Sequence, residues 1–380
     1  MKQFILPLSL LPFLWSCDAS KTVTAEPENT VEVAPPSKGK SRTIDLDYLN
    51  NSIKPQDDFF EFSNGTWLKD NPVPPSESRW GSFNELEQAN NKKLTALLEE
   101  FKAISGEYES GTIQQILGEY YASFTNMDVR NKLGIAAIDN DLSIIKSINS
   151  KKSIPSVIAK MHSIGIGGLF RFGVGQDMKN VESNIASLSQ GGIGLPNKDY
   201  YLEESKAEIL EKYKAHITAM MILTGYPEED AGEFAKSVVA FETRLAGVMM
   251  ARAELRVPEN TYNKMSKSDA IAAAGDFDLE AYLRDCGIES FDSLIVGQPE
   301  FLKNLSTLVK DLSLSDWRFY LTWKVIDNYA GHLDTRFVEQ NFDFYGRVLS
   351  GKTEMKPINE RAIGEITHQE FGELLGKAFV

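Results

Sequence analysis

Residues 195–201 read LPNKDYY, and the pattern of the chain changes on either side of this stretch. Before it, residues 165–195 contain LFRFGVGQ and NIASLSQGG, which are short, bounded by glycine and partly alternating in polarity. Such a pattern predicts a small β-hairpin. After it, apolar side chains recur at helical spacing from Ile209 to Met220 and from Phe234 to Val248, which predicts two helices.

The same helical spacing continues toward both ends of the chain. Ser82 and Glu85 have the spacing of a capping box, which predicts a helix start at this point. Two more apolar stripes follow the helical period: Phe83, Leu86, Leu94, Leu97, Leu98 and Phe101; and Ile113, Ile116, Leu117, Tyr120, Tyr121 and Phe124. A further helix is predicted to include Trp317, Tyr320, Leu321, Trp323 and Lys324. The predicted fold class is therefore mainly α, a multi-helical lobe with a small β-hairpin element.

Composition limits the classes of function. The 380 residues are 42% hydrophobic and 10% aromatic, which is enough to form a large globular core. There are 54 acidic and 40 basic residues, a formal charge of −14, and no cluster of lysines and arginines. Binding to a phosphate backbone needs such a cluster, so nucleic acid is excluded as a partner.

Histidine is scarce, and this argues against a zinc site within the chain. The four histidines are His162, His216, His332 and His368, and none has a second histidine four residues away as in H-E-x-x-H. There is also no C-x-x-C, G-x-S-x-G or Walker motif. No catalytic, cofactor-binding or metal-binding residue is assigned, and His216 is interpreted as a packed helix histidine.

Three other kinds of residue cluster could form functional sites but have simpler structural interpretations. The acidic clusters Asp57-Asp58 and 228–230 could act as acids or hold calcium, but charges at helix starts explain them better. The glycine stretch 191–194 lacks the lysine of a phosphate loop and favours a turn. Aromatic residues at 59, 60, 62 and 67 could line a groove, but core packing is the favoured interpretation.

The amino terminus has the pattern of a lipoprotein signal. Lys2 precedes an uncharged, mostly apolar run, and residues 14–17 (LWSC) resemble a lipobox in which Cys17 carries the lipid. The alternative is an ordinary signal peptide with Cys17 incidental. Residues 1–17 are thus assigned as signal and lipobox, 18–43 as a proline-containing tether, and 44–380 as the folded body. Cys286 would then be a buried free thiol.

The stretch LPNKDYY resembles the L-P-x-(K/R)-D-Y-Y signature of the neprilysin and endothelin-converting-enzyme family of zinc metalloendopeptidases. Further segments in the same order are similar to motifs of that family. They are PQDDFFEFSNGTWL (55–68), RWGSF (79–83), ETRLA (242–246), Pro258 with TYNKM (261–265), NFDFYG (341–346) with LSG (349–351), and GELLGKAFV (372–380). One departure is Ile358-Asn359, where the family has Arg-Trp.

The resemblance implies that residues 44–380 are the amino-terminal helical domain of such a peptidase. In the family this lobe closes over the active site, while the H-E-x-x-H zinc helix lies in a later, carboxy-terminal lobe. The chain ends at Val380 without that lobe, so we expect a fragment that binds no zinc and is inactive alone. Its expected partners are a catalytic lobe encoded downstream, peptide substrates, and the membrane through its lipid anchor.

A second hypothesis is a stand-alone lipoprotein that binds peptides or a partner protein. Under either hypothesis the expected location is the cell envelope, facing the periplasm or the cell surface.

Overall fold

The computed structural model describes residues 45–288, 290–368 and 371–380. The predicted signal, with Cys17, and the whole of the predicted tether, 18–43, lie outside these residues. The chain divides into two compact units, one ending at Asp70 and the other comprising Asn71–Val380. Within the described ranges, no helix combines the length and apolar character needed to cross a membrane.

The first unit consists of a 3-10 helix, Leu46–Tyr48, and the helix α1, Phe59–Asp70. The Asp58 carboxylate accepts a hydrogen bond from the Glu61 backbone N–H at 2.8 Å, so this acidic residue stabilises a helix start as predicted. Phe59 and Phe60 are 69% and 64% exposed. Core packing was therefore the wrong interpretation for these two phenylalanines.

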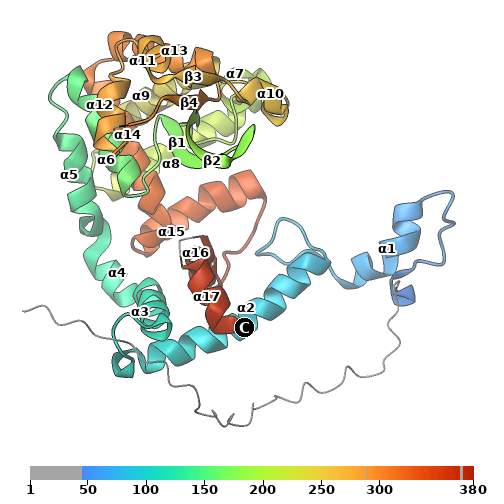
Figure 1. The fold of residues 1–380 in the computed structure, drawn as a ribbon. Helices are drawn as coiled ribbons and strands as arrows, with labels where there is room; N and C mark the ends of the chain where they lie inside the picture. Colours follow the sequence, from blue (N-terminus) through green and yellow to red (C-terminus); the bar gives the residue numbers. More distant parts are fainter. Residues whose placement is uncertain (1–44, 289, 369–370) are drawn as a thin grey trace, which may run out of the picture. The chain divides into compact units, whose positions relative to one another are not determined.

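Four helices of the second unit pack around a small hydrophobic core: α2 (Ser82–Ala103), α3 (Ile113–Thr125), α16 (Ile358–His368) and α17 (Gly372–Phe379) (Figure 1). Helices α2 and α3 approach closely because Gly118 has no side chain at their contact. A Cβ atom at Gly118 would lie 2.6 Å from the Phe101 carbonyl oxygen. We call this the smaller core; its buried members are Leu98, Phe101, Leu117, Tyr121, Ala362, Ile363, Ile366 and Leu375.

Most other elements of the second unit enclose a larger core that contains most of the fully buried aromatic side chains. The helices of the second unit outside the smaller core are α4 (Met127–Leu133), α5 (Asp139–Lys146), α6 (Ile154–Ser163), α7 (Asp199–Leu202), α8 (Ala207–Leu223), α9 (Glu228–Gly247), α10 (Pro258–Thr261), α11 (Lys267–Ala274), α12 (Leu279–Asp285), α13 (Pro299–Asp311), α14 (Leu314–Tyr329) and α15 (Thr335–Asn341). All of them except α4 and α10 contribute hydrophobic residues to the larger core. A π-helix, η8, follows at Phe342–Val348, and short 3-10 helices lie at 105–107, 134–138, 151–153, 204–206, 254–256 and 330–332.

A four-stranded sheet lies against this larger core in the order β1-β2-β4-β3. The predicted hairpin is confirmed as β1 (Phe170–Asp177) and β2 (Asn180–Gln190), paired antiparallel. Strand β4 (Ser293–Val296) runs parallel to β2, and β3 (Lys264–Ser266) pairs antiparallel with β4. The last two strands were not predicted because they are only 4 and 3 residues long.

The mainly helical class is confirmed: the four predicted apolar stripes fall on α2, α3, α8 and α9, and the further predicted helix is α14. The capping box at Ser82 is wrong, because α2 begins at Ser82 and its N-cap is Gly81, without a side-chain cap. Cys286 has no disulfide partner within the described residues, but its side chain is partly exposed rather than buried.

Gly118→Ala should destabilise the smaller core. The new Cβ atom would overlap the Phe101 backbone, so α2 and α3 would have to separate. We expect the free energy of unfolding in urea to fall by about 1–3 kcal/mol. The matched control is Gly232→Ala on α9, where no atom lies within 4 Å of the added carbon. The control should raise stability by about 0.5–1 kcal/mol, and equal effects of both variants would contradict the close contact.

Candidate functional site

The stretch LPNKDYY packs over a buried carboxylate, Glu242 of α9. The Tyr201 hydroxyl donates a hydrogen bond to Glu242 at 2.6 Å, and the Gly194 backbone N–H donates to the same carboxylate at 3.2 Å. On the opposite side, Lys324 Nζ of α14 lies 2.7 Å from Glu242 Oε1, and both side chains are buried. The Tyr213 hydroxyl of α8 also donates to Glu242, at 3.3 Å. One carboxylate thus joins this loop to three helices.

Two glycines, Gly192 and Gly194, let the loop pack closely against the hydroxyls of Tyr320 and Tyr213. Gly192 has φ +89°, and a Cβ atom there would lie 2.5 Å from the Tyr320 hydroxyl. A Cβ atom at Gly194 would overlap the Tyr213 hydroxyl. The Tyr320 hydroxyl donates to the Gly192 carbonyl and accepts from the Leu169 N–H, each at 2.8 Å. The glycine stretch 191–194 therefore forms a tight turn packed on aromatic side chains.

A second acid, Asp327 of α14, connects this network to the π-helix η8. The Tyr345 hydroxyl of η8 donates to Asp327 at 2.9 Å. Burial raises the pKa of Asp327 to about 6, although Lys324 and the Tyr345 hydrogen bond both act in the opposite direction. The predicted packing of His216 is also confirmed here, because its ring is buried and stacks on Phe344 of η8.

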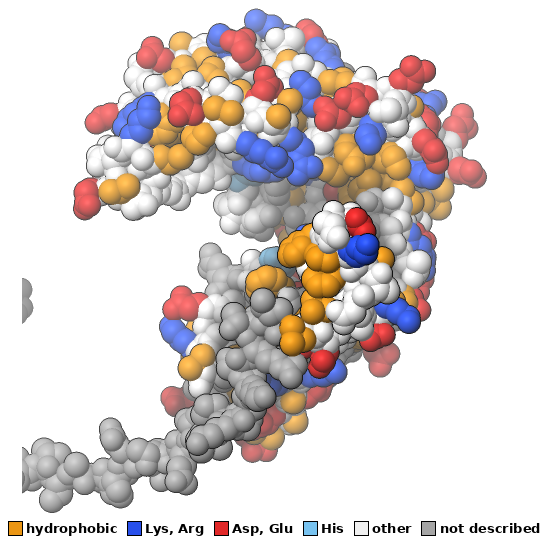
Figure 2. Space-filling model, turned by 90° about the vertical axis from the view of Figure 1, so that its right-hand side faces the viewer, with side chains coloured by type: hydrophobic (Ala, Val, Ile, Leu, Met, Phe, Trp, Pro, Cys, Tyr) orange, Lys and Arg blue, Asp and Glu red, His pale blue; other side chains and the backbone are white. Residues whose placement is uncertain are grey.

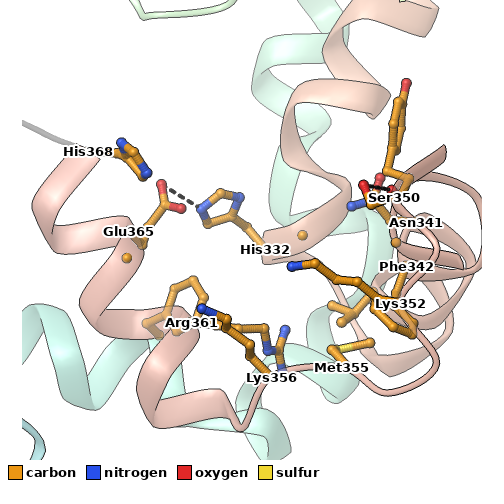
Figure 3. Close-up of a pocket in the computed structure, with 16 residues that line it drawn as sticks. His332, Asn341, Phe342, Ser350, Lys352, Met355, Lys356, Arg361, Glu365 and His368 are labelled. Carbon is orange, nitrogen blue, oxygen red and sulfur yellow. Dashed lines mark hydrogen bonds and ion pairs between the residues drawn. The ribbon is translucent and has the colours of Figure 1, made fainter. Parts of the chain in front are cut away.

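Beside η8 lies a cavity of about 410 Å³, which we call the basic cavity (Figure 3). His332 and Lys352 reach it from one side, while Glu365 and His368 reach it from α16 on the other. Its lining residues are Phe124, Gly331, His332, Val338, Asn341, Phe342, Tyr345, Gly346, Ser350, Lys352, Met355, Lys356, Arg361, Gly364, Glu365 and His368. They combine apolar walls with three formal positive charges and one carboxylate.

Two of the charged groups in the basic cavity have partners of opposite charge. His332 Nε2 lies 3.1 Å from Glu365 Oε1, and Lys356 Nζ lies 2.7 Å from Glu77 Oε1. Among the described residues, Lys352 and Arg361 form no ion pair, and the buried Arg361 Nε has no hydrogen-bond partner. Burial lowers the pKa of the Arg361 guanidinium from its usual value. The cavity therefore offers two positive side chains to an incoming anion.

A second cavity of about 590 Å³, the apolar cavity, adjoins the first, and Lys356, Arg361, Gly364 and His368 line both. Its apolar lining comes from Phe83, Leu86 and Leu94 of α2 and Ile363 of α16, with polar residues at its rim. Phe83 and Leu86 are 86% and 58% exposed although they belong to the predicted apolar stripe. Figure 2 shows one face of the molecule, on which lysine and arginine side chains gather next to patches of hydrophobic side chains.

Within the part of the chain that the structure describes, no three His, Cys, Asp or Glu side chains come close enough to hold a metal ion together. These residues therefore do not fit a zinc site, and we assign them no step through zinc. The acidic cluster 228–230 occupies the first turn of α9, as predicted for helix-start charges.

A family model described as Peptidase family M13 matches residues 55–380. The chain belongs to peptidase family M13. It is 27% identical over 353 residues to endothelin-converting enzyme 1 of Rattus norvegicus, covering 88% of this chain and 45% of that protein. It is 26% identical over 313 residues to an endothelin-converting enzyme homolog of Locusta migratoria, covering 77% and 42% respectively.

Solved structures of M13 proteins have the same fold. The zinc metalloprotease ZMP1 of Mycobacterium tuberculosis, in complex with an inhibitor, superimposes with a TM-score of 0.84 and 27% identity. That match covers 89% of this chain and 51% of ZMP1. PepO from Lactobacillus rhamnosis matches with a TM-score of 0.72 and 21% identity, which shows the fold alone. The M13 chain thus spans about half the length of the relatives it matches.

The family resemblance drawn from the sequence motifs is therefore confirmed, but the basic cavity was missed. Its charged residues come from separate segments, among them His332 in the 3-10 helix that follows α14, Lys352 after η8 and Arg361 on α16. The one available signal was the spacing of Lys352, Lys356 and Arg361, which recur every four or five residues. That spacing alone does not distinguish a cavity from a solvated surface.

Glu242→Gln should strongly destabilise the larger core, because it leaves Lys324 buried without a carboxylate. We expect the free energy of unfolding in urea to fall by about 3–5 kcal/mol. The double variant Glu242→Gln with Lys324→Met removes both charges and should recover part of this loss. Glu233→Gln, an exposed position on the same helix, is the control and should change stability by less than about 1 kcal/mol. A similar small effect at Glu242 would contradict its central position.

Proposed function

We propose that this chain is the amino-terminal, non-catalytic lobe of a neprilysin-like M13 zinc metalloendopeptidase. In this proposal it contributes to hydrolysis of oligopeptides only when joined to a zinc-bearing carboxy-terminal lobe, and alone it is inactive. The match to ZMP1 carries the proposal, because 89% of this chain aligns with only 51% of a zinc metalloprotease at a TM-score of 0.84. The family match, residues 55–380, covers most of the predicted folded body, 44–380.

The exposed end of α2 supports a contact with such a second lobe. Phe83 and Leu86 project from the first turns of α2 and border the apolar cavity. Large apolar side chains exposed beside an apolar cavity are typical of protein interaction surfaces. We propose that the catalytic lobe covers Phe83 and Leu86, and that peptide substrates enter between the two lobes.

We further propose that the protein is anchored in the cell envelope through a lipid on Cys17, facing the periplasm or the cell surface. The support is the apolar run that ends at Cys17 and the proline-containing segment 18–43, which would space the folded body from the membrane.

A stand-alone peptide- or protein-binding lipoprotein is the second candidate function. The basic cavity favours it, because all its lining residues belong to the second unit of this chain. Ligand binding there needs no further lobe.

Activity measurements separate these functions. With zinc added, the purified chain should bind no stoichiometric zinc and cleave no peptide.

A chimera that joins residues 45–380 to the part of ZMP1 not covered by this chain should cleave a peptide at least about tenfold above background, and a chelator should abolish the cleavage. Phe83→Ser with Leu86→Ser should lower this activity in the chimera, whereas Val129→Ser, another exposed apolar residue, should not. Chelator-sensitive cleavage by the chain alone would contradict the proposal.

Cys17→Ser should release the protein from the membrane, because it removes the only atom to which the lipid would attach. We expect most of the variant in the soluble fraction after cell breakage, with unchanged thermal unfolding. Cys286→Ser is the control and should stay in the membrane fraction. An unmodified Cys17 thiol, measured by mass spectrometry of the amino-terminal peptide, would refute the anchor.

A further inference from the structure

The charges of the basic cavity are not balanced by the residues that line it. Its one carboxylate, Glu365, pairs with His332. Lys356 is held by Glu77 at 2.7 Å and by Glu87 at 3.6 Å. Lys352 and Arg361 remain as the two cations that have no carboxylate partner among the described residues. Both line the same open pocket beside η8.

Arg361 occupies an unfavourable position in the absence of a ligand. Its buried Nε has no hydrogen-bond partner within the described chain. Burial lowers the pKa of a second guanidinium, that of Arg130, and repulsion by the positive charge of Arg361 lowers it further. A buried donor without a partner costs free energy, because it has lost its hydrogen bonds to water, so the Nε of Arg361 does not stabilise this fold.

Arg130, by contrast, has a complete structural role. Its guanidinium donates hydrogen bonds to the carbonyl oxygens of Phe124, Gly331 and Leu333, at 2.8–3.1 Å. These bonds hold α4 against the loop that carries His332. The two arginines therefore differ. The N–H groups of Arg130 donate hydrogen bonds to backbone carbonyls of the fold, whereas the Nε of Arg361 has no acceptor within the described chain.

We propose that the basic cavity binds a carboxylate of an acidic oligopeptide, with Arg361 and Lys352 as the two side chains that hold it. Arginine suits this task because its planar guanidinium can bind both oxygens of a carboxylate. The ligand carboxylate supplies the negative charge that the lining residues lack.

The shape of the cavity indicates a peptide rather than a small inorganic anion. A volume of about 410 Å³ lies in the usual range for ligand pockets and exceeds the space that a single carboxylate needs. Val338, Phe342, Tyr345 and Met355 provide apolar surface for a neighbouring side chain. We therefore expect an aspartate or glutamate next to an apolar residue. This inference deepens the proposed function by naming its substrate class. It rests on the proposed function only in taking the ligand to be a peptide.

The test measures binding to the full chain alone, so its result does not depend on whether a catalytic lobe restores peptidase activity. The probes are acetyl-Ala-Phe-Glu-Ala-amide and its glutamine analogue, titrated calorimetrically at low salt. The glutamate peptide should bind at least about tenfold more tightly than the glutamine peptide. Arg361→Gln should abolish this preference, and Lys352→Gln should reduce it about threefold or more. Arg256→Gln and Lys160→Gln, at exposed positions outside the cavity, should leave it unchanged.

Thermal unfolding distinguishes a ligand-binding role from a structural one. Since the buried Nε of the half-buried Arg361 has no partner in the described fold, Arg361→Gln should unfold at the same temperature as the parent chain or higher. If Arg361→Gln lowers that temperature by several degrees, Arg361 is a structural residue and the inference fails for it. In that case the Lys352→Gln variant decides whether the cavity binds a carboxylate. If it prefers the glutamate peptide over the glutamine peptide as strongly as the parent chain does, the inference is overturned.

Three other results would overturn the proposal. They are equal affinities for the two peptides, no binding of either at millimolar concentration, and an equal loss of preference in Arg256→Gln. Inorganic phosphate provides the last comparison. If phosphate binds in an Arg361-dependent way and the glutamate peptide does not, the cavity is a simple anion site and the peptide assignment is wrong.

Discussion

Burying the Glu242 carboxylate is possible only if donors from every neighbouring element point toward it, and this requirement organises the larger core. The donors are the Gly194 N–H, the hydroxyls of Tyr201 and Tyr213, and the Lys324 ammonium. Each comes from a different segment, so the loop at 191–198 and helices α7, α8 and α14 must all be in place around α9. Through Lys324, Asp327 and Tyr345, the same network reaches η8 and the wall of the basic cavity.

Helix α16 links the two cores to the candidate site. On one face it places Ile363 and Ile366 in the smaller core, and from neighbouring positions it directs Arg361 and Glu365 into the basic cavity. The His332–Glu365 pair then connects α16 to the 3-10 helix that follows α14. The geometry of the cavity therefore depends on how the smaller core packs, although none of the buried residues of that core carries a charge.

The helices could be predicted from the sequence because their apolar stripes are local and strongly periodic, as in α8 and α9. Strands β3 and β4 could not, because a few residues carry no readable period and their pairing is set by distant segments. Periodicity identified Phe83 and Leu86 as an apolar face but could not tell whether this chain covers it. Arg361 illustrates a similar limit, because its unpaired state follows from the positions of Arg130 and Glu365 and not from its own surroundings in the sequence.

The close contact at Gly118 also has a mechanical consequence. Helix α2 has 22 residues, which corresponds to a rod of roughly 33 Å, and it is clamped to α3 near Phe101 at its carboxyl end. Phe83 lies at the opposite end, about 27 Å from the clamp along the axis. A rotation of about 5° at the clamp would therefore displace Phe83 by roughly 2 Å. The Lys356–Glu87 ion pair and the Asn359–Thr95 hydrogen bond oppose such a rotation, because they tie the middle and the amino-terminal half of α2 to α16 and the segment before it.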